Sequence, residues 1–331
     1  MNGKEILGAN AGPSTLQKRN TNVDVFRCML MFLIVLHHSY VRGPWYANGA
    51  LWTLWFSTFI HWHVDGFIGI SGWFGIDFKW RKFVRLWVLM AFYGCLLFFV
   101  GRILKVQDIS FSLNFGGWFG GSYLALMFCA PFLNRAIDGM VTAGKRAVLS
   151  AWGMCAIMMT LTWCPGHLFT GVNANHVSQF SFTTMVFVYC TGRLVRVMFP
   201  RPLSLKVLLL GPLVFLGTIL VIGGGKTLLQ VYRGKPHGAA AWDFLTVYNA
   251  PHVWVMAISM LLIFAWHVKC PLWLGRVCSF LAPSMFSVYL IHEVSPLGRC
   301  AISFLEQCPP LSTTPVELFS LLQLSYMWDA S

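Results

Sequence analysis

The sequence has 331 residues, of which 57% are hydrophobic and only 11% are charged, and its mean hydropathy is +0.65. A soluble domain carries about 25% charged residues, so this composition excludes a soluble enzyme, a disordered chain and a coiled coil, and it predicts an integral membrane protein. The net charge of +13 does not indicate nucleic acid here, because basic residues beside membrane spans are orientation signals that lie next to anionic membrane lipid.

Apolar stretches of about 20 residues, the length that crosses a bilayer, recur along the chain. They predict an all-α, polytopic membrane bundle of nine to ten transmembrane helices. The nine clear spans are residues 24–41, 51–76, 86–103, 118–137, 147–163, 180–198, 207–223, 248–267 and 277–293. If the N-terminus lies in the cytoplasm, 17 of the 24 Lys and Arg residues fall on the cytoplasmic side, which is the orientation that the positive-inside rule favours.

Three regions follow from these spans. Residues 1–20 are predicted to form a cytoplasmic tail, residues 21–295 the membrane-embedded domain, and residues 296–331 an atypical C-terminal segment. In that segment only Glu317–Trp328 is apolar enough to associate with the membrane, and about twelve residues are too few to cross it. A tenth span is therefore missing, shortened or replaced.

The first span contains ionisable residues, which are costly inside a membrane and usually functional. His38 lies eleven positions after Arg27, a step of about 1100° and about 16 Å along a helix, so both lie on one face. Asp24 is close to the same stripe near the helix start, whereas His37 points about 100° away. An alternative reading is that Asp24 and Arg27 only cap the helix and that His38 bonds a neighbouring carbonyl.

The second span adds His61, His63 and Asp65, followed by glycines that would let another helix or a ligand come close. Asp65 lies four residues after His61 on the same helical face, so its carboxylate could hold an imidazole, either His61 or His38, in one tautomer. The alternative is that Asp65 is a solvated residue on the outer side.

Just after the second span comes a basic cluster that contains Arg81, Lys82 and Arg85. Arg81 and Arg85 share a helical face, and two guanidinium groups with a nearby lysine match the charge and geometry of phosphates. The alternative is that these residues only anchor the span on its cytoplasmic side.

Several motifs together resemble the transmembrane acyltransferase-3 family of bacterial O-acyltransferases. They are Asp24-x-x-Arg27-x10-His38, Val64 to Gly72, Arg81-Lys82-x-x-Arg85, Trp118-Phe119 with Pro131 to Asn134, Gly192-Arg193, and Ser287 to His292. The resemblance implies ten spans, an acyl-CoA donor taken from the cytoplasm, and transfer of the acyl group, commonly acetyl, to a hydroxyl of a glycan. It implies catalytic importance for Arg27 and His38, and donor binding by Arg81 and Arg85.

Acyl transfer from a thioester needs a base for the acceptor hydroxyl and hydrogen-bond donors for the developing oxyanion. We predict His38 as the base, with Arg27, Asp24 and Asp65 completing the catalytic set. Arg81, Lys82 and Arg85 are predicted to hold acyl-CoA, and Ser71, Trp118 and His292 to contact the substrate. The expected donor is acetyl-CoA without a metal, and the expected acceptor is a polysaccharide or lipid-linked glycan at the bacterial inner membrane.

Two other classes of function stay open at this stage. A bis-imidazole haem protein could use His38, His61, His252 and His292 from different spans, and a transporter or flippase would also contain buried charges. A disulfide between Cys300 and Cys308 is a further possibility on the outer side. The acceptor sugar, the acylated position and the oligomeric state are not specified by the sequence.

Overall fold

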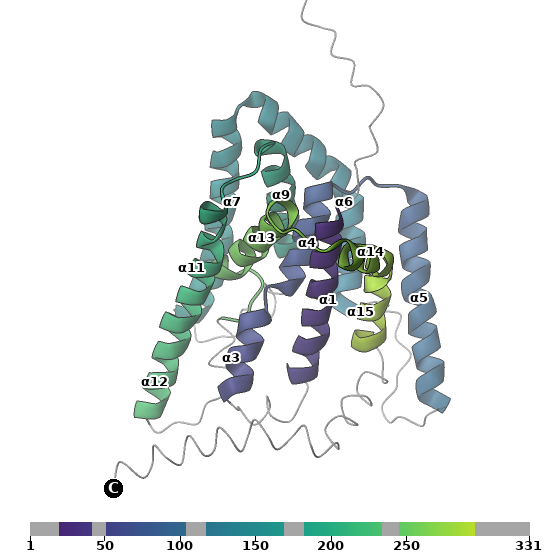
Figure 1. Ribbon diagram of the computed structural model, residues 1–331, viewed down its shortest axis with the longest axis horizontal. Helices are drawn as coiled ribbons and strands as arrows, with labels where there is room; N and C mark the ends of the chain where they lie inside the picture. Colours follow the sequence, from purple (N-terminus) through teal and green to yellow (C-terminus); the bar gives the residue numbers. More distant parts are fainter. Residues whose placement is uncertain (1–19, 42–50, 104–116, 169–181, 234–244, 295–331) are drawn as a thin grey trace, which may run out of the picture.

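The computed structural model describes residues 20–41, 51–103, 117–168, 182–233 and 245–294, and within these ranges every regular element is helical (Figure 1). Five helical segments are long and apolar enough to cross a membrane, and these are Thr21–Ser39, Trp80–Ile103, Gly117–Ala143, Leu205–Leu229 and Leu272–His292. Pro251–Trp266 is a shorter apolar helix. The predicted all-α membrane bundle is therefore confirmed. The tail before Asn20, the segment 296–331 and the Cys300–Cys308 pair lie outside the described residues.

Each of the nine predicted spans corresponds to a helix or to a run of consecutive helices. The elements of the first five spans are α1 (Thr21–Val41), α3 (Leu51–Ile60), α4 (His63–Phe74), α5 (Trp80–Ile103), α6 (Gly117–Ala143) and α7 (Lys145–Leu168). The elements of the last four are α9 (Phe182–Met198), α10 (Leu205–Leu208), α11 (Leu210–Thr218), η1 (Ile219–Gly223), α12 (Gly224–Tyr232), α13 (Pro251–Trp266), α14 (Leu272–Leu281), η3 (Ala282–Ser284) and α15 (Met285–Val294).

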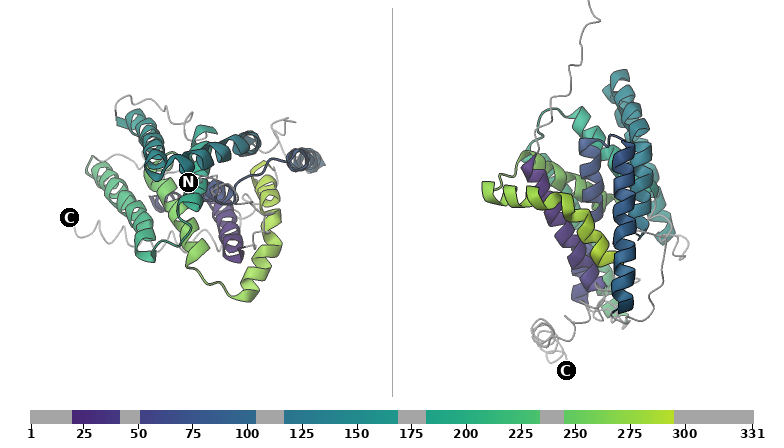
Figure 2. Two further views of the ribbon diagram at one scale, coloured as in Figure 1. Left: turned by 90° about the horizontal axis from the view of Figure 1, so that it is seen from above. Right: turned by 90° about the vertical axis from the view of Figure 1, so that its right-hand side faces the viewer.

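Three spans that the sequence predicts as single helices are interrupted. The second breaks at His61 and Trp62, between α3 and α4. The seventh begins earlier and ends later than predicted, and it includes the π-helical turn η1. In the last span Pro283 lies in the short 3₁₀ turn η3, and because proline cannot continue the helical hydrogen bonding, α14 and α15 run in different directions (Figure 2).

Helix α4 is packed into the middle of the bundle through its glycines. A Cβ atom at Gly72 would collide with the Tyr189 carbonyl oxygen of α9, and one at Gly192 of α9 would collide with the Gly69 carbonyl oxygen. The two backbones can approach this closely only because neither position carries a side chain. On the α1 side, a Cβ at Gly66 would lie 2.7 Å from Leu30 Cδ2. These contacts fix α4 against both α9 and α1.

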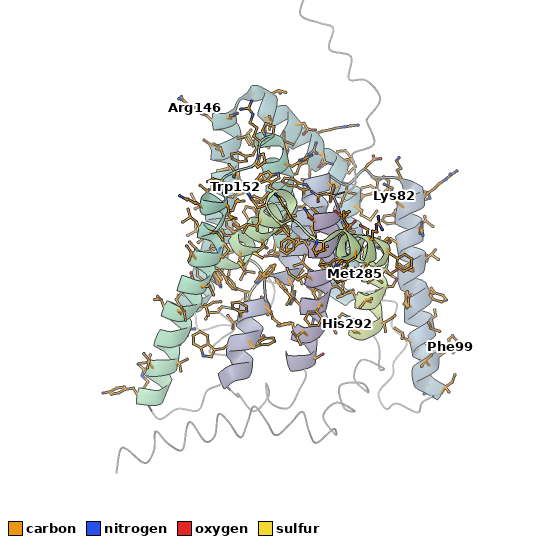
Figure 3. The ribbon with its side chains drawn as sticks, viewed as in Figure 1. Lys82, Phe99, Arg146, Trp152, Met285 and His292 are labelled. Carbon is orange, nitrogen blue, oxygen red and sulfur yellow. The ribbon has the colours of Figure 1, made fainter. Side chains whose placement is uncertain are left out.

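Helix α5 stands at the edge of the bundle (Figures 1 and 2). Its large apolar side chains are exposed, among them Trp87, Phe92 and Phe99, as expected for a helix that faces lipid. Figure 3 places Lys82, at the start of α5, and Arg146, at the start of α7, toward the same upper end of the molecule, with Phe99 and His292 lower. That upper, basic end is the one that the positive-inside rule predicts to be cytoplasmic.

Candidate active site

The α1 residues Asp24, Arg27 and His38, which the sequence places on one helical face, contact neighbouring helices at both ends of that face. At the basic end, Arg27 Nη1 donates to Asp24 Oδ1 at 3.1 Å, and the hydroxyl of Ser279 in α14 donates to Asp24 Oδ2 at 2.8 Å. Asp24 is only 4% exposed, so both of its oxygens need these donors. Asp24 lies in the first turn of α1, where the helix dipole also favours a carboxylate. The capping role of Asp24 and its position on the stripe are therefore compatible.

His38, three turns further along α1, is hydrogen-bonded to a second imidazole. Its Nδ1 lies 2.8 Å from Nε2 of His292 in α15, and Nδ1 of His292 lies 2.9 Å from the carbonyl oxygen of Val288. A carbonyl oxygen can only accept, so His292 carries its proton on Nδ1 and, when neutral, accepts at Nε2. His38 must then donate from Nδ1, which puts the lone pair of neutral His38 on Nε2.

Arg27 and His38 thus lie along the side of α1 that packs against α14 and α15, with the Asp24–Arg27 pair beside α14 and His38 beside α15. Neither side chain points only at lipid, and His38 bonds an imidazole rather than the backbone carbonyl considered as its alternative partner. Both nitrogens of His292 are engaged by Val288 and His38. In this arrangement His292 orients His38, and its predicted contact with substrate stays a prediction.

Three further histidines are buried beside His38. His37 Nε2 lies 3.0 Å from the hydroxyl oxygen of Ser57 in α3. The His37 ring centroid lies 5.7 Å from that of His38, 5.2 Å from that of His61 and 5.0 Å from that of His63. Together with His292, these residues form a cluster of five imidazoles, hereafter the histidine cluster, contributed by α1, by the break between α3 and α4, and by α15.

The environment of Asp65 matches neither of the two that the sequence predicted, a pairing with an imidazole or exposure to solvent on the outer side. Asp65 is 2% exposed, so it is not a solvated residue of the outer side, and its Oδ2 is buried without a hydrogen-bond partner among the described residues. No ion pair within the described part of the chain joins it to His61 or His38. The reason is the helix break: His61 lies in the turn before α4 and Asp65 lies inside α4, so the four-residue spacing between them does not follow one helical face.

Ser71 and Trp118, the other predicted substrate contacts, have different immediate partners. The Ser71 hydroxyl is 3.1 Å from both the Phe67 carbonyl oxygen and the Tyr123 hydroxyl of α6. Trp118, at the start of α6, stacks on Tyr248, with ring centroids 5.7 Å apart, and Tyr248 stacks on His61 at 4.4 Å. Trp118 is therefore joined to the histidine cluster through an aromatic column, whereas Ser71 is held by Tyr123.

The basic residues predicted to hold acyl-CoA are exposed at the start of α5. Arg81, Lys82 and Arg85 form no ion pair within the described ranges, whereas nearby Lys79 lies 3.4 Å from Asp77 Oδ2. Their charges are thus available to an anion at the basic end of the molecule.

The connection between α4 and α5 is tied down by a network that sequence reasoning missed. The Tyr189 hydroxyl accepts from the Ile76 backbone N–H at 2.9 Å and donates to Asn134 Oδ1 at 2.9 Å, and the Asn134 amide donates to the Ile76 carbonyl oxygen at 3.1 Å. Gly75 has a φ of 71°, a conformation that glycine adopts most readily. This network fixes the chain just before the basic triad. Tyr189 could have been found only as a polar side chain in an apolar span.

The haem hypothesis does not fit the arrangement of three of its four histidines. His38 and His292 are hydrogen-bonded to each other at 2.8 Å, and His252 Nε2 lies 3.1 Å from the Leu245 carbonyl oxygen. Two imidazole nitrogens on opposite sides of one metal ion would be about 4 Å apart. Among the described residues, no group of three His, Cys, Asp or Glu side chains is arranged to hold a metal ion.

Comparison with protein families gives one match. The model of the Acyl_transf_3 family, described as an acyltransferase domain, covers residues 20–319. Comparisons with curated proteins and with solved structures gave no match. Because the family match spans nearly the whole chain, the protein belongs to the acyltransferase-3 family, and it is an integral membrane acyltransferase.

Proposed function

We propose that this membrane acyltransferase transfers an acyl group, most simply acetyl, from acyl-CoA to a hydroxyl of a polysaccharide or lipid-linked glycan at the bacterial inner membrane. The observation that carries the proposal is the hydrogen-bonded series from Val288 through His292 to His38. It supports His38 as a general base, because it orients the lone pair of Nε2 away from His292. In a serine protease, a hydrogen bond to an aspartate likewise holds the catalytic imidazole in its active tautomer.

The His292 imidazole also stabilises the protonated form of His38, which is generated during catalysis. When His38 Nε2 takes the proton of the acceptor hydroxyl, the positive charge forms next to the lone pair of His292 Nε2, which accepts a charge-assisted hydrogen bond from His38 Nδ1. His38 can then return the proton to the departing thiolate sulfur of CoA. In this scheme Val288 and His292 are positioning groups, and His38 is the catalytic residue.

The basic triad Arg81, Lys82 and Arg85 supports a donor that carries several phosphates. These side chains are exposed and are not neutralised by a carboxylate in the described residues, and guanidinium groups bind phosphate oxygens in pairs. Arg27 lies deeper, paired with Asp24. We propose that the phosphates of CoA stay at the basic end while the pantetheine arm extends along α1 toward His38.

A direct test uses the purified protein in detergent or nanodiscs with acetyl-CoA and cell-surface glycan from the host. Free thiol is measured with a colorimetric thiol reagent, and the glycan is examined by mass spectrometry for added acetyl mass. Thiol release that depends on glycan, together with acetylated glycan, is expected. A protein that moves glycan across vesicles without releasing thiol would instead support a transporter.

A further inference from the structure

The second span carries buried polar groups that nothing in the described structure satisfies. His63 is fully buried and His61 is 6% exposed, and all four of their ring nitrogens lack a hydrogen-bond partner among the described residues. Buried polar groups in proteins are nearly always paired, so each exception calls for an explanation. A neutral imidazole presents one N–H donor and one acceptor. A molecule that enters the cluster and offers polar atoms to it would satisfy these ring nitrogens.

These imidazoles are located where a helix begins inside the membrane. Helix α4 starts at His63, twelve residues long, and its N-cap residue Trp62 provides no side-chain cap. The first N–H groups of a helix have no acceptor within the helix, and the helix dipole makes this end favourable for negative charge. In membrane proteins, interrupted helices direct such ends at anionic groups of the substrate.

The break also adjoins the proposed base. The His63 ring centroid is 5.0 Å from that of His37, which lies 5.7 Å from that of His38. The His61 ring is held against Tyr248, with centroids 4.4 Å apart. The His61 and His63 imidazoles and the N-terminus of α4 therefore lie beside His37, whose ring neighbours that of His38, the proposed base.

We propose that the break between α3 and α4 is the oxyanion site of the transferase, in which His63, assisted by His61 and the N-terminus of α4, donates hydrogen bonds to the thioester carbonyl oxygen. This inference rests on the proposed function. The acceptor hydroxyl oxygen bonds to the carbonyl carbon while its proton passes to His38 Nε2. The carbonyl oxygen becomes negative in the tetrahedral intermediate, the carbon–sulfur bond then breaks, and the proton goes from His38 to the CoA sulfur.

The inference can be tested with two CoA ligands, one with a planar thioester carbonyl and one with a ketone that becomes tetrahedral. Acetyl-CoA is planar at the reacting carbon, whereas a CoA thioether with a trifluoromethyl ketone hydrates to a tetrahedral, oxyanion-like centre. The dissociation constants of both are measured for the wild-type protein and for His63→Leu. The wild-type protein should bind the ketone at least about a hundredfold more tightly than acetyl-CoA. In His63→Leu this preference should fall about 10²–10³-fold, the usual effect of losing one oxyanion donor, with acetyl-CoA affinity little changed.

Two further variants test whether the effect of His63→Leu comes from a folding defect rather than from the lost donor. Asn and Gln at position 63 keep an amide donor near the position of Nδ1 or Nε2 respectively, so one of His63→Asn and His63→Gln should retain part of the preference. His252→Leu is the matched control, because His252 is 2% exposed and its ring is bonded to the Leu245 carbonyl oxygen. It should keep the wild-type preference for the ketone.

The outcomes separate this inference from the proposed function. A wild-type protein that binds neither ligand would overturn the acyl-CoA donor and the oxyanion site with it. A wild-type protein that turns over acetyl-CoA but shows no preference for the ketone would overturn the oxyanion site alone. The same conclusion would follow if His63→Leu and His252→Leu lowered the affinity for both ligands equally.

Discussion

His38 of α1 and His292 of α15, 254 positions apart in the chain, share a hydrogen bond of 2.8 Å. Because the Val288 carbonyl oxygen fixes the proton of His292 on Nδ1, this bond also fixes the tautomer of His38. The pairing connects the first and last described helices, so the proposed base is oriented only when the whole bundle is assembled.

Replacing His292 should impair the chemical step more than donor binding. We expect His292→Leu to lower kcat by about 10²–10⁴-fold, the usual range for general-base catalysis, with a nearly unchanged KM for acetyl-CoA. His292→Gln offers an amide oxygen that can accept from His38 Nδ1 and should recover part of the rate.

A pH profile distinguishes orientation of His38 from simple packing by His292. In His292→Glu, a carboxylate beside His38 would favour its protonated form, which cannot act as a base. The acidic limb of the kcat/KM profile should therefore move to higher pH. An unchanged limb in a folded His292→Glu variant would mean that His292 does not interact with the catalytic base.

Removing a guanidinium from the basic triad should weaken donor binding and leave the chemical step intact. Arg85→Ala is expected to raise the KM for acetyl-CoA about tenfold, as for the loss of one charge-assisted hydrogen bond of about 1.5 kcal/mol, with little change in kcat. Arg146→Ala is a matched control, since Arg146 lies toward the same end of the molecule but on α7 (Figure 3). An equal change in both variants would indicate a general effect of surface charge, and no change in either would place the phosphates elsewhere.

The close approach of α4 and α9 should make Gly72 intolerant of any side chain. A Cβ atom there would overlap the Tyr189 carbonyl oxygen, so Gly72→Ala should destabilise the fold by about 1–3 kcal/mol or more. Gly121→Ala provides the comparison, because a Cβ at Gly121 meets nothing within 4 Å. Thermal unfolding of the two purified variants measures the difference, and equal midpoints would contradict the packing described for α4.

Much of the fold could be predicted from the sequence because hydropathy sets the spans independently of how they pack. The three interruptions could not, since apolar residues continue through them. His61 and Trp62, for example, lie in a span that the sequence predicts as one helix, and only the structure shows that α3 ends before them. The same break explains why the spacing from His61 to Asp65 gave the wrong partner for Asp65.

In the candidate site, too, some features could be predicted from the sequence and others could not. The stripe from Arg27 to His38 follows from helical periodicity within one element, so its geometry could be predicted. The His38–His292 bond and the juxtaposition of His37 with His61 and His63 depend on contacts between helices far apart in the sequence. Periodicity carries no information about such contacts. For the same reason, the network of Tyr189, Asn134 and Ile76 was not anticipated.

The most direct test of the account is the rate of glycan-dependent thiol release from acetyl-CoA by His38→Ala, compared with wild type and with His267→Gln. His267 is a matched histidine at the end of α13, where its Nε2 lies 2.8 Å from the Leu203 carbonyl oxygen. We expect His38→Ala to lose acyl transfer while it folds and still binds acetyl-CoA, and His267→Gln to keep the wild-type rate. Acyl transfer at the wild-type rate by a folded His38→Ala variant would contradict the assignment of His38 as the catalytic base.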